Sequence, residues 1–196
     1  MGIAAGSVFL PSAAEAQTPM LAADRMNELG PQNGALAKQA GLWDVTQTVW
    51  VTPGAAPVTT TGLVAERRMI GSVLQEILHP ASDRSGNSIK RIDYLSFNRA
   101  EARWDYVSMD MRAPVGIMSA WSFDRDPGER IRVIFQPFAL AGDKAAVSGQ
   151  MLRMDEVIAR QGPNHNTKDQ HFILADATGT AWLAYRYAYV RRIVKG

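Results

Sequence analysis

The chain has 196 residues and a formal net charge of +2, with 46% hydrophobic and 20% charged residues. A chain of this size and composition is typical of one globular domain with a sizeable core, and its small net charge gives no electrostatic reason to expect a nucleic-acid partner. Cysteine is absent from the sequence, which excludes disulfide bonds, thiolate metal ligands and a cysteine nucleophile.

Residues 1–16 resemble a secretion signal. An apolar stretch there ends in the small-x-small sequence Ala14-Glu15-Ala16, the pattern that signal peptidase cleaves. No Lys or Arg precedes Arg25, so a basic n-region is missing, and we interpret the segment as a truncated signal peptide, with an Ala-rich tail as the alternative. We therefore expect a periplasmic or secreted protein. No other apolar run approaches the roughly 18 residues of a membrane-spanning helix.

Residues 17–40 are expected to form a short helical segment ahead of the main domain. Helix-forming residues there are interrupted by Gly30-Pro31, and a proline in a helix interior removes a hydrogen bond and clashes with the preceding turn. We therefore predict two short helical pieces, which lie outside the main domain or cap one end of it.

Residues 41–193 are predicted to form an all-β domain, a closed antiparallel barrel of about ten strands. Turn-forming residues separate segments in which apolar and polar residues alternate, the period of a half-buried strand. The predicted strands are 42–52, 58–69, 73–79, 88–97, 102–109, 115–124, 130–137, 148–160, 168–175 and 180–193. The short links leave no room for crossover helices, and closure into a barrel removes exposed strand edges.

Three stretches resemble the bacterial family called domain of unknown function 1579, which is lipocalin-like (a calycin). They are GLWDVTQTVWVTPGAAPVTTTGLVAERRMIGSVLQE, DYLSFNRAEARWDYVSMDMRAPVGIMSAWSFD and the final YAYVRR. The sequence departs from the family pattern at Asn98 and at 109–112, where it is longer and more charged. The resemblance implies a lipocalin-like barrel with an internal cavity, and it implies no activity.

The resemblance also implies structural roles for both ends of the barrel domain. In lipocalins a Gly-x-Trp sequence opens the first strand, its Trp plugs the closed end of the barrel, and an Arg of the last strand packs over the Trp. The matching residues are Gly41 and Trp43, with Arg191 or Arg192 as the cation, depending on the strand register. Glycine leaves the turn into the strand free of a side chain, and Trp supplies a large flat aromatic ring for the closed end of the barrel.

Alternate residues of a barrel strand point inward, so the sequence also predicts cavity walls. With Trp43 inward, the same face carries Val45, Gln47, Val49 and Val51. Two later consecutive strands supply the densest aromatic and methionine content, which suits varied apolar ligands. The candidate ligand-binding residues are Trp104, Tyr106, Met109, Met118 and Trp121, with Glu76 and His171 as polar residues that orient the ligand. Ordinary core packing is the alternative for the apolar members.

Candidate catalytic groups are few. His171 lies in mid-strand and, if it faces inward, it is able to hold a ligand, metal or haem iron; a hydrogen-bonded structural role is the alternative. No second histidine stands two residues away, which disfavours a metal site. Burial of an unpaired Glu76 or Asp105 raises its pKa, but pairing with Arg68, Arg103 or Arg132 is the favoured interpretation. The sequence contains no Gly-x-Ser-x-Gly nucleophile elbow and no phosphate-binding glycine loop.

The favoured function is therefore binding, as an exported carrier or sensor of a small apolar or amphipathic molecule inside the barrel. One alternative is an enzyme of isomerase or hydrolase type that uses the barrel mouth. A second is haem binding, as in the nitrobindin branch of the calycins, which depends on His171. The sequence assigns no cofactor, leaves a homodimer open, and predicts neither a nucleic-acid partner nor a membrane span.

Overall fold

The computed structural model describes Asp24 and residues 28–83, 87–113, 115–122, 124–139 and 149–193. The expected signal peptide at 1–16 and most of the first expected helical piece lie outside these residues. Within the described residues, no helix is long and apolar enough to cross a membrane.

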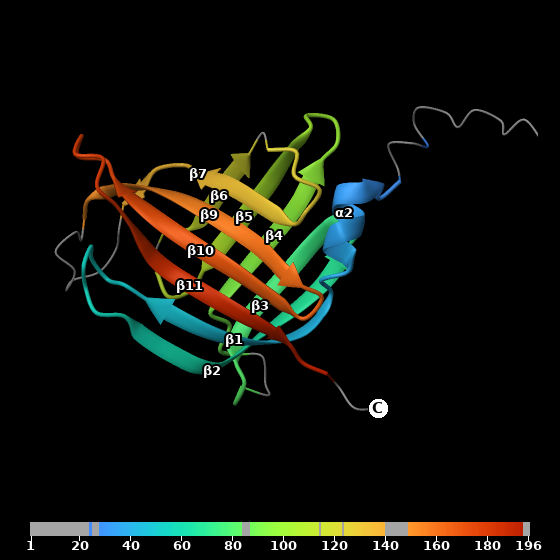
Figure 1. Ribbon diagram of the computed structural model, residues 1–196, viewed down its shortest axis with the longest axis horizontal. Helices are drawn as coiled ribbons and strands as arrows, with labels where there is room; N and C mark the ends of the chain where they lie inside the picture. Colours follow the sequence, from blue (N-terminus) through green and yellow to red (C-terminus); the bar gives the residue numbers. More distant parts are fainter. Residues whose placement is uncertain are drawn as a thin grey trace, which may run out of the picture.

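The described residues form a closed antiparallel β-barrel, which confirms the predicted fold class (Figure 1). The strands are β1 (Gly41–Val49), β2 (Val58–Ile70), β3 (Val73–Pro80), β4 (Arg91–Asn98), β5 (Arg103–Asp110), β6 (Ile117–Ser122), β7 (Arg130–Phe135), β8 (Phe138–Ala139), β9 (Met151–Gly162), β10 (His165–Leu174) and β11 (Ala181–Arg191). Neighbours pair in chain order from β1 to β7, and the pairs β7–β9, β9–β10, β10–β11 and β11–β1 close the ring. The two-residue β8 pairs with β9 beyond the end of β7, so ten strands form the wall.

The strand predictions differ from the structure mainly at strand ends. The first strand ends at Val49 rather than at residue 52, and Val51, predicted to face inward, is 48% exposed in the turn that follows. Strand β10 begins at His165, three residues before its predicted start, because a tight turn at Pro163 and Asn164 lets pairing with β9 resume at once. The very short β8 gave no sequence signal, since two residues show no alternation.

Helix α2 (Gly30–Ala37) caps one end of the barrel, at the right in Figure 1. Pro31 lies in its first turn, where a missing N–H costs nothing, so Gly30-Pro31 begins this helix. The Asn33 side chain accepts a hydrogen bond from the backbone N–H of Phe97 at 2.8 Å and donates one to its carbonyl at 3.1 Å. Leu36 is fully buried in the main hydrophobic cluster. The helix therefore closes this end as part of the core.

Trp43 forms the floor of the barrel at the same end. Its side chain has no exposed surface, its indole N–H donates to the Gln39 carbonyl at 2.9 Å, and the Arg191 guanidinium lies 4.3 Å from its ring centroid. The predicted Trp–Arg contact is thus confirmed, with Arg191 as the partner. Arg192 pairs instead with Asp44 on the outer surface. Gly41 has a φ of 128°, and an added Cβ would lie 3.0 Å from Arg191 Nη1, which explains the glycine.

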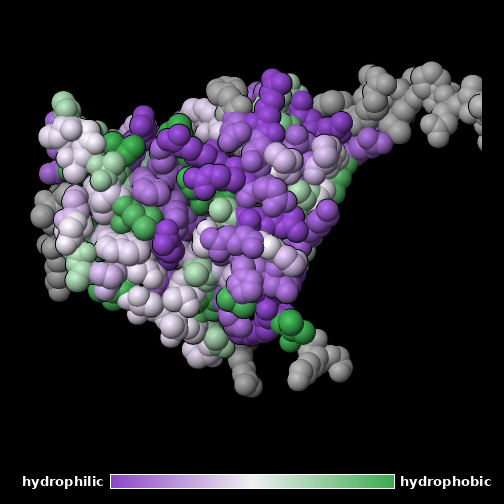
Figure 2. Space-filling view, viewed as in Figure 1, coloured by the Kyte–Doolittle hydropathy of each residue, from purple (hydrophilic) through white to green (hydrophobic). Residues whose placement is uncertain are grey.

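The outer face over β9 to β11 is mostly hydrophilic. Figure 2 shows hydrophobic residues scattered among hydrophilic ones on this side. Scattered apolar residues are normal on a protein surface, and this face therefore gives no indication of a large apolar contact.

Replacing Trp43 with Ala is expected to lower the free energy of unfolding by about 3–5 kcal/mol, because rigid neighbours leave the vacated volume empty. Chemical denaturation followed by circular dichroism measures this loss. Trp121→Ala is the control: that side chain is 36% exposed on the outer face, so its loss should be about 1 kcal/mol or less. Equal losses for the two variants would contradict a plug role for Trp43.

Candidate functional site

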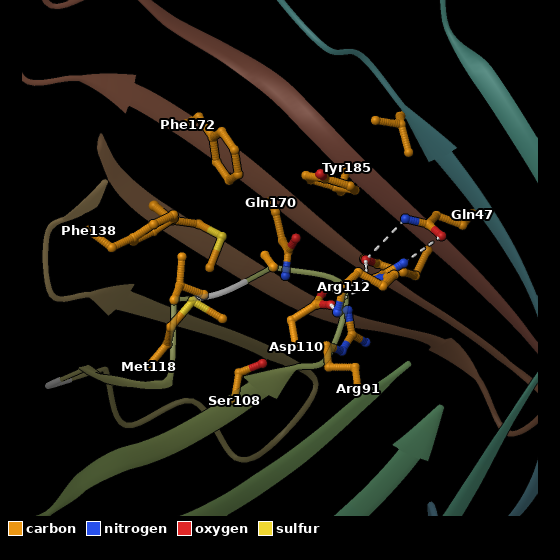
Figure 3. A pocket seen from close by; sticks show the side chains of 15 residues that line it. Gln47, Arg91, Ser108, Asp110, Arg112, Met118, Phe138, Gln170, Phe172 and Tyr185 are labelled. Atoms are coloured by element: carbon orange, nitrogen blue, oxygen red, sulfur yellow. Dashed lines mark hydrogen bonds and ion pairs between the residues drawn. The ribbon is translucent and has the colours of Figure 1, made fainter. Parts of the chain in front are cut away.

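A cavity of about 300 Å³ occupies the barrel end opposite helix α2. It lies where β1 and β5 end and β4 begins, and the loop after β5 borders it. Its lining residues are Gln47, Val49, Arg91, Ser108, Asp110, Arg112, Ala113, Val115, Met118, Phe138, Met154, Gln170, Phe172, Tyr185 and Tyr187. Figure 3 shows that they divide into an apolar side and a polar side.

The apolar wall consists of Met118, Phe138, Met154 and Phe172, contributed by β6, β8, β9 and β10. The rings of Phe138 and Phe172 meet edge to face with centroids 5.9 Å apart, and the ring of Tyr185 lies 5.7 Å from that of Phe172. Methionine side chains adapt to irregular shapes, while aromatic rings offer large rigid surfaces. This wall therefore suits an apolar group of variable shape.

The polar wall centres on Arg112, which reaches back into the barrel from the loop after β5. Its guanidinium pairs with Asp110 at 2.6 Å and donates to Gln47 Oε1 at 3.0 Å and to the Tyr187 hydroxyl at 3.2 Å. Burial by itself raises the pKa of Asp110, but hydrogen bonds from Arg112 and its positive charge outweigh burial and lower that pKa. The aspartate is therefore a paired anion and a poor proton acceptor.

Below the polar wall, Arg91 connects the cavity to an ion cluster in the middle of the barrel. We use "ion cluster" for Arg67, Glu76, Arg91, Asp93 and Lys168, whose exposed fractions are all 6% or less. Arg67 Nε lies 2.7 Å from Glu76, Lys168 Nζ lies 2.7 Å from Asp93, and Arg91 contacts both carboxylates at 3.0 and 2.8 Å. Three cations thus share two carboxylates.

The opposite charges of the ion cluster stabilise one another in their ionised forms. Burial alone would raise the pKa of Glu76, but the positive charges of Lys168, Arg67 and Arg91 hold it well below its ordinary value of 4.5. The Tyr189 hydroxyl donates a further hydrogen bond to Glu76 at 3.0 Å. Since a buried charge is tolerated only when it is paired and hydrogen-bonded, each member depends on the others.

Glu156 is a third buried acid beside the cluster, on β9. It is fully buried, Gln170 donates to its Oε2 at 2.7 Å, and its Oε1 has no hydrogen-bond partner in the described structure. Burial raises its pKa, and the opposing charge of Lys168 does not cancel that effect. Glu156 is therefore a weaker counter-charge for the cations than Glu76 is.

Three of the predicted ligand-binding residues line the described pockets. Met118 belongs to the apolar wall of the main cavity. Tyr106 and Glu76 instead border a separate space of about 20 Å³ within the ion cluster, room for about one water molecule. Trp104 packs at the opposite end, in the hydrophobic cluster that contains Leu36 of helix α2. The strand pair predicted as one wall therefore serves three regions of the interior.

The other three predicted residues, Met109, Trp121 and His171, lie on strand positions that face outward. On β5 the buried positions are 104, 106 and 108, so Met109 has the opposite orientation. Trp121 follows the buried Ala120 and lies under the guanidinium of Arg103, 5.9 Å away. His171 stands between the two inward positions 170 and 172 of β10. None of these three lines the main cavity.

The placement of His171 removes the geometric basis for haem or metal binding inside the barrel through this residue. Within the described part of the chain, no group of three or more His, Asp or Glu side chains is arranged to hold a metal ion. His79 lies on β3, and its Nε2 hydrogen-bonds Glu66 of β2 at 3.1 Å.

The predicted ion-pair partner is confirmed for Asp105 but not for Glu76. Asp105 pairs with Arg103 at 2.7 Å, as expected. The expected pairing of Glu76 with Arg68, Arg103 or Arg132 is wrong, because Arg68 has the outward orientation on β2 and the inward neighbour Arg67 takes the acid instead.

Sequence reasoning missed most of the ion cluster and Arg112, the centre of the polar wall. Arg91, Asp93 and Lys168 occupy inward positions of their strands, and a search for charged residues in phase with buried apolar ones would have found them. Arg112 lies in a loop without periodicity; only the charged departure at 109–112 indicated that this loop is unusual.

No protein-family model and no curated protein matches this chain. The site is therefore interpreted from its own residues.

Replacing Glu76 with Gln is expected to cost about 3–5 kcal/mol of stability at pH 7, because it leaves buried cations short of a counter-charge. A depressed pKa stabilises the fold above the unfolded-state value near 4.5, and this contribution fades as the pH falls through the folded-state pKa. The difference in the free energy of unfolding between wild type and variant should therefore decrease below about pH 4.5. Urea titrations at several pH values measure this difference.

The matched control is Asp44→Asn, which breaks the exposed pair with Arg192. An exposed pair contributes about 0–1 kcal/mol, so this variant should remain close to wild type. A Glu76→Gln variant as stable as the control at pH 7 would contradict the cluster's structural role.

Proposed function

We propose that the protein binds one small amphipathic molecule in the cavity at the open end of the barrel, as a carrier or sensor. The observation that supports this most directly is the division of the cavity into an apolar wall and a polar wall. Ligand sites are typically concave, mostly apolar, and equipped with a few polar groups that fix orientation.

The cavity volume limits the size of the ligand. A cavity of about 300 Å³ holds roughly ten water-sized groups, at about 30 Å³ for each. A molecule with about ten non-hydrogen atoms fits, and burial of its apolar part contributes about 25 cal/mol per Å². The polar wall then determines which end of the ligand points toward Arg112 and Arg91.

Binding is favoured over catalysis by the state of the acids. Asp110, which lines the cavity, is held as an ion pair by Arg112, and Glu156, whose pKa is raised, lies behind Gln170 rather than on the cavity surface. A general base needs direct or water-mediated contact with its substrate. These acids therefore support binding better than they support a reaction.

We further propose that the protein is exported and belongs to the lipocalin-like family that its sequence resembles. The proposal of export is supported by the small-x-small sequence at 14–16. The family proposal is supported by the Gly-x-Trp start of β1 and by the contact of its Trp43 with Arg191 of the last strand.

Val49→Trp is expected to fill the cavity and lower the affinity for the neutral fluorescent probe N-phenyl-1-naphthylamine at least about tenfold, because Val49 lines the cavity and Trp takes up its space. Thr48→Trp is the control, since this neighbour lies on the opposite face of β1. Fluorescence titration of both variants and wild type measures the affinities. Failure of the wild type to take up the probe, or equal uptake by all three proteins, would contradict the proposal.

A further inference from the structure

We propose that the ligand is an amphipathic acid whose carboxylate is held between Arg91, Arg112 and Tyr187, with its apolar part against the methionine and phenylalanine wall. This inference rests on the proposed function and specifies the chemical class of the molecule. It follows from the balance of charges and of hydrogen-bond donors at the inner end of the cavity.

The charge balance beside the cavity is positive. Among the described residues, Arg67, Arg91 and Lys168 contact only two carboxylates, those of Glu76 and Asp93. Of these three cations, Arg91 is the one that lines the main cavity. An uncompensated positive charge in a poorly solvated interior is costly, so an added anion is favoured there.

The remaining acids do not supply that anion well. Asp110 already pairs with Arg112 at 2.6 Å. Glu156 contacts the Gln170 amide and none of the three cations within ion-pair distance, and burial, the largest influence on it, favours its neutral form. A carboxylate brought in by the ligand therefore provides a counter-charge that the described protein lacks at this point.

Arg91 and Tyr187, at the inner end of the cavity, also offer unused donors. Arg91 Nη1 is buried and makes neither a hydrogen bond nor an ion pair with the described residues, whereas Nη2 and Nε make ion-pair contacts with Glu76 at 3.0 Å and with Asp93 at 2.8 Å. The Tyr187 oxygen accepts hydrogen bonds from Gln47 at 3.4 Å and from Arg112 at 3.2 Å, and no acceptor for its own proton is found in the described structure. Each buried donor that has no acceptor costs free energy, unless a ligand atom accepts its hydrogen bond.

A carboxylate matches these donors better than an alcohol or an amine does. It accepts hydrogen bonds only, on two oxygens, and charge-assisted bonds to Arg are about twice as strong as neutral ones. A hydroxyl brings a proton of its own, which is mismatched with Arg91 and Tyr187, and an ammonium group offers only donors. Octanoic acid, with ten non-hydrogen atoms, is therefore a suitable test ligand for a cavity of about 300 Å³.

The experiment compares octanoate, octan-1-ol and octylammonium by isothermal titration calorimetry at neutral pH. We expect octanoate to bind about ten- to a hundredfold more tightly than octanol, the ratio given by one charge-assisted hydrogen bond to Arg. Octylammonium should bind more weakly than either, because its charge repels the Arg91 side of the cavity.

Two variants locate the carboxylate. Arg112→Gln and Tyr187→Phe should each lower octanoate affinity at least about fivefold while changing octanol affinity by less than about twofold, since they remove donors but leave the apolar wall intact. The matched control is Arg186→Gln, which removes one positive charge just as Arg112→Gln does. Arg186 precedes Tyr187 on β11 but pairs with Asp169 on the outer surface. Thermal unfolding shows whether each variant is folded. Because Arg112 lies outside the ion cluster, its replacement leaves that cluster complete.

The outcomes separate the two proposals. Equal affinity for octanoate and octanol, a preference for octylammonium, or an effect of Arg186→Gln as large as that of Arg112→Gln would overturn the acid inference while leaving a binding cavity. Absence of binding for all three ligands and for N-phenyl-1-naphthylamine would overturn the proposed function as well.

Discussion

The arrangement of the interior depends on one buried carboxylate, that of Glu76. It accepts hydrogen bonds from Arg67 on β2, Arg91 on β4, Lys168 on β10 and Tyr189 on β11. Strands β2 and β4 pair with β3, whereas β10 and β11 pair with none of these three strands, so the single acid on β3 connects two separate parts of the barrel wall. Removing any one charged partner leaves another buried charge unpaired, which costs free energy of folding. This cost fixes the arrangement of the side chains at the centre of the barrel.

The position of the ion cluster also explains why the cavity lies at one end. On the helix side, the fully buried side chains of Leu36, Trp43 and Trp104 fill the space. Arg67 extends from Glu76 to within 4.9 Å of the Trp43 ring centroid. On the other side, Arg91 is the last member of the cluster, and it forms the inner boundary of the cavity. The same guanidinium therefore stabilises the barrel centre and places a buried cation beside the cavity that we propose as the ligand site.

The fold was predictable from the sequence because its signals are local. Turn residues and period-2 alternation located the ten strands of the wall. The resemblance of the Gly-x-Trp start to lipocalins implied a contact of Trp43 with Arg191 or Arg192, and the register selects Arg191. The site was much less predictable, since it depends on the orientation of each side chain. A shift by one residue moves a side chain to the other face of a strand, which is why Met118 lines the cavity and Trp121 lies outside. The pair of Lys168 with Asp93 joins residues 75 positions apart, a contact that one sequence does not reveal.

Stability alone does not account for the charged interior. Well-packed apolar residues of similar volume are often as stabilising as a buried ion network, or more so, because they avoid the desolvation of charges. The barrel instead keeps three cations against two paired carboxylates, with one of the cations, Arg91, at the boundary of the cavity. The inner end of the cavity is positive and rich in hydrogen-bond donors, and it adjoins an apolar wall that contains two methionines. The two parts of the cavity therefore differ in charge and polarity, as the parts of a purely hydrophobic core do not. Such a charge asymmetry allows a cavity to select one end of an amphipathic molecule, and it relates the energetic cost of the cluster to the binding function that we propose.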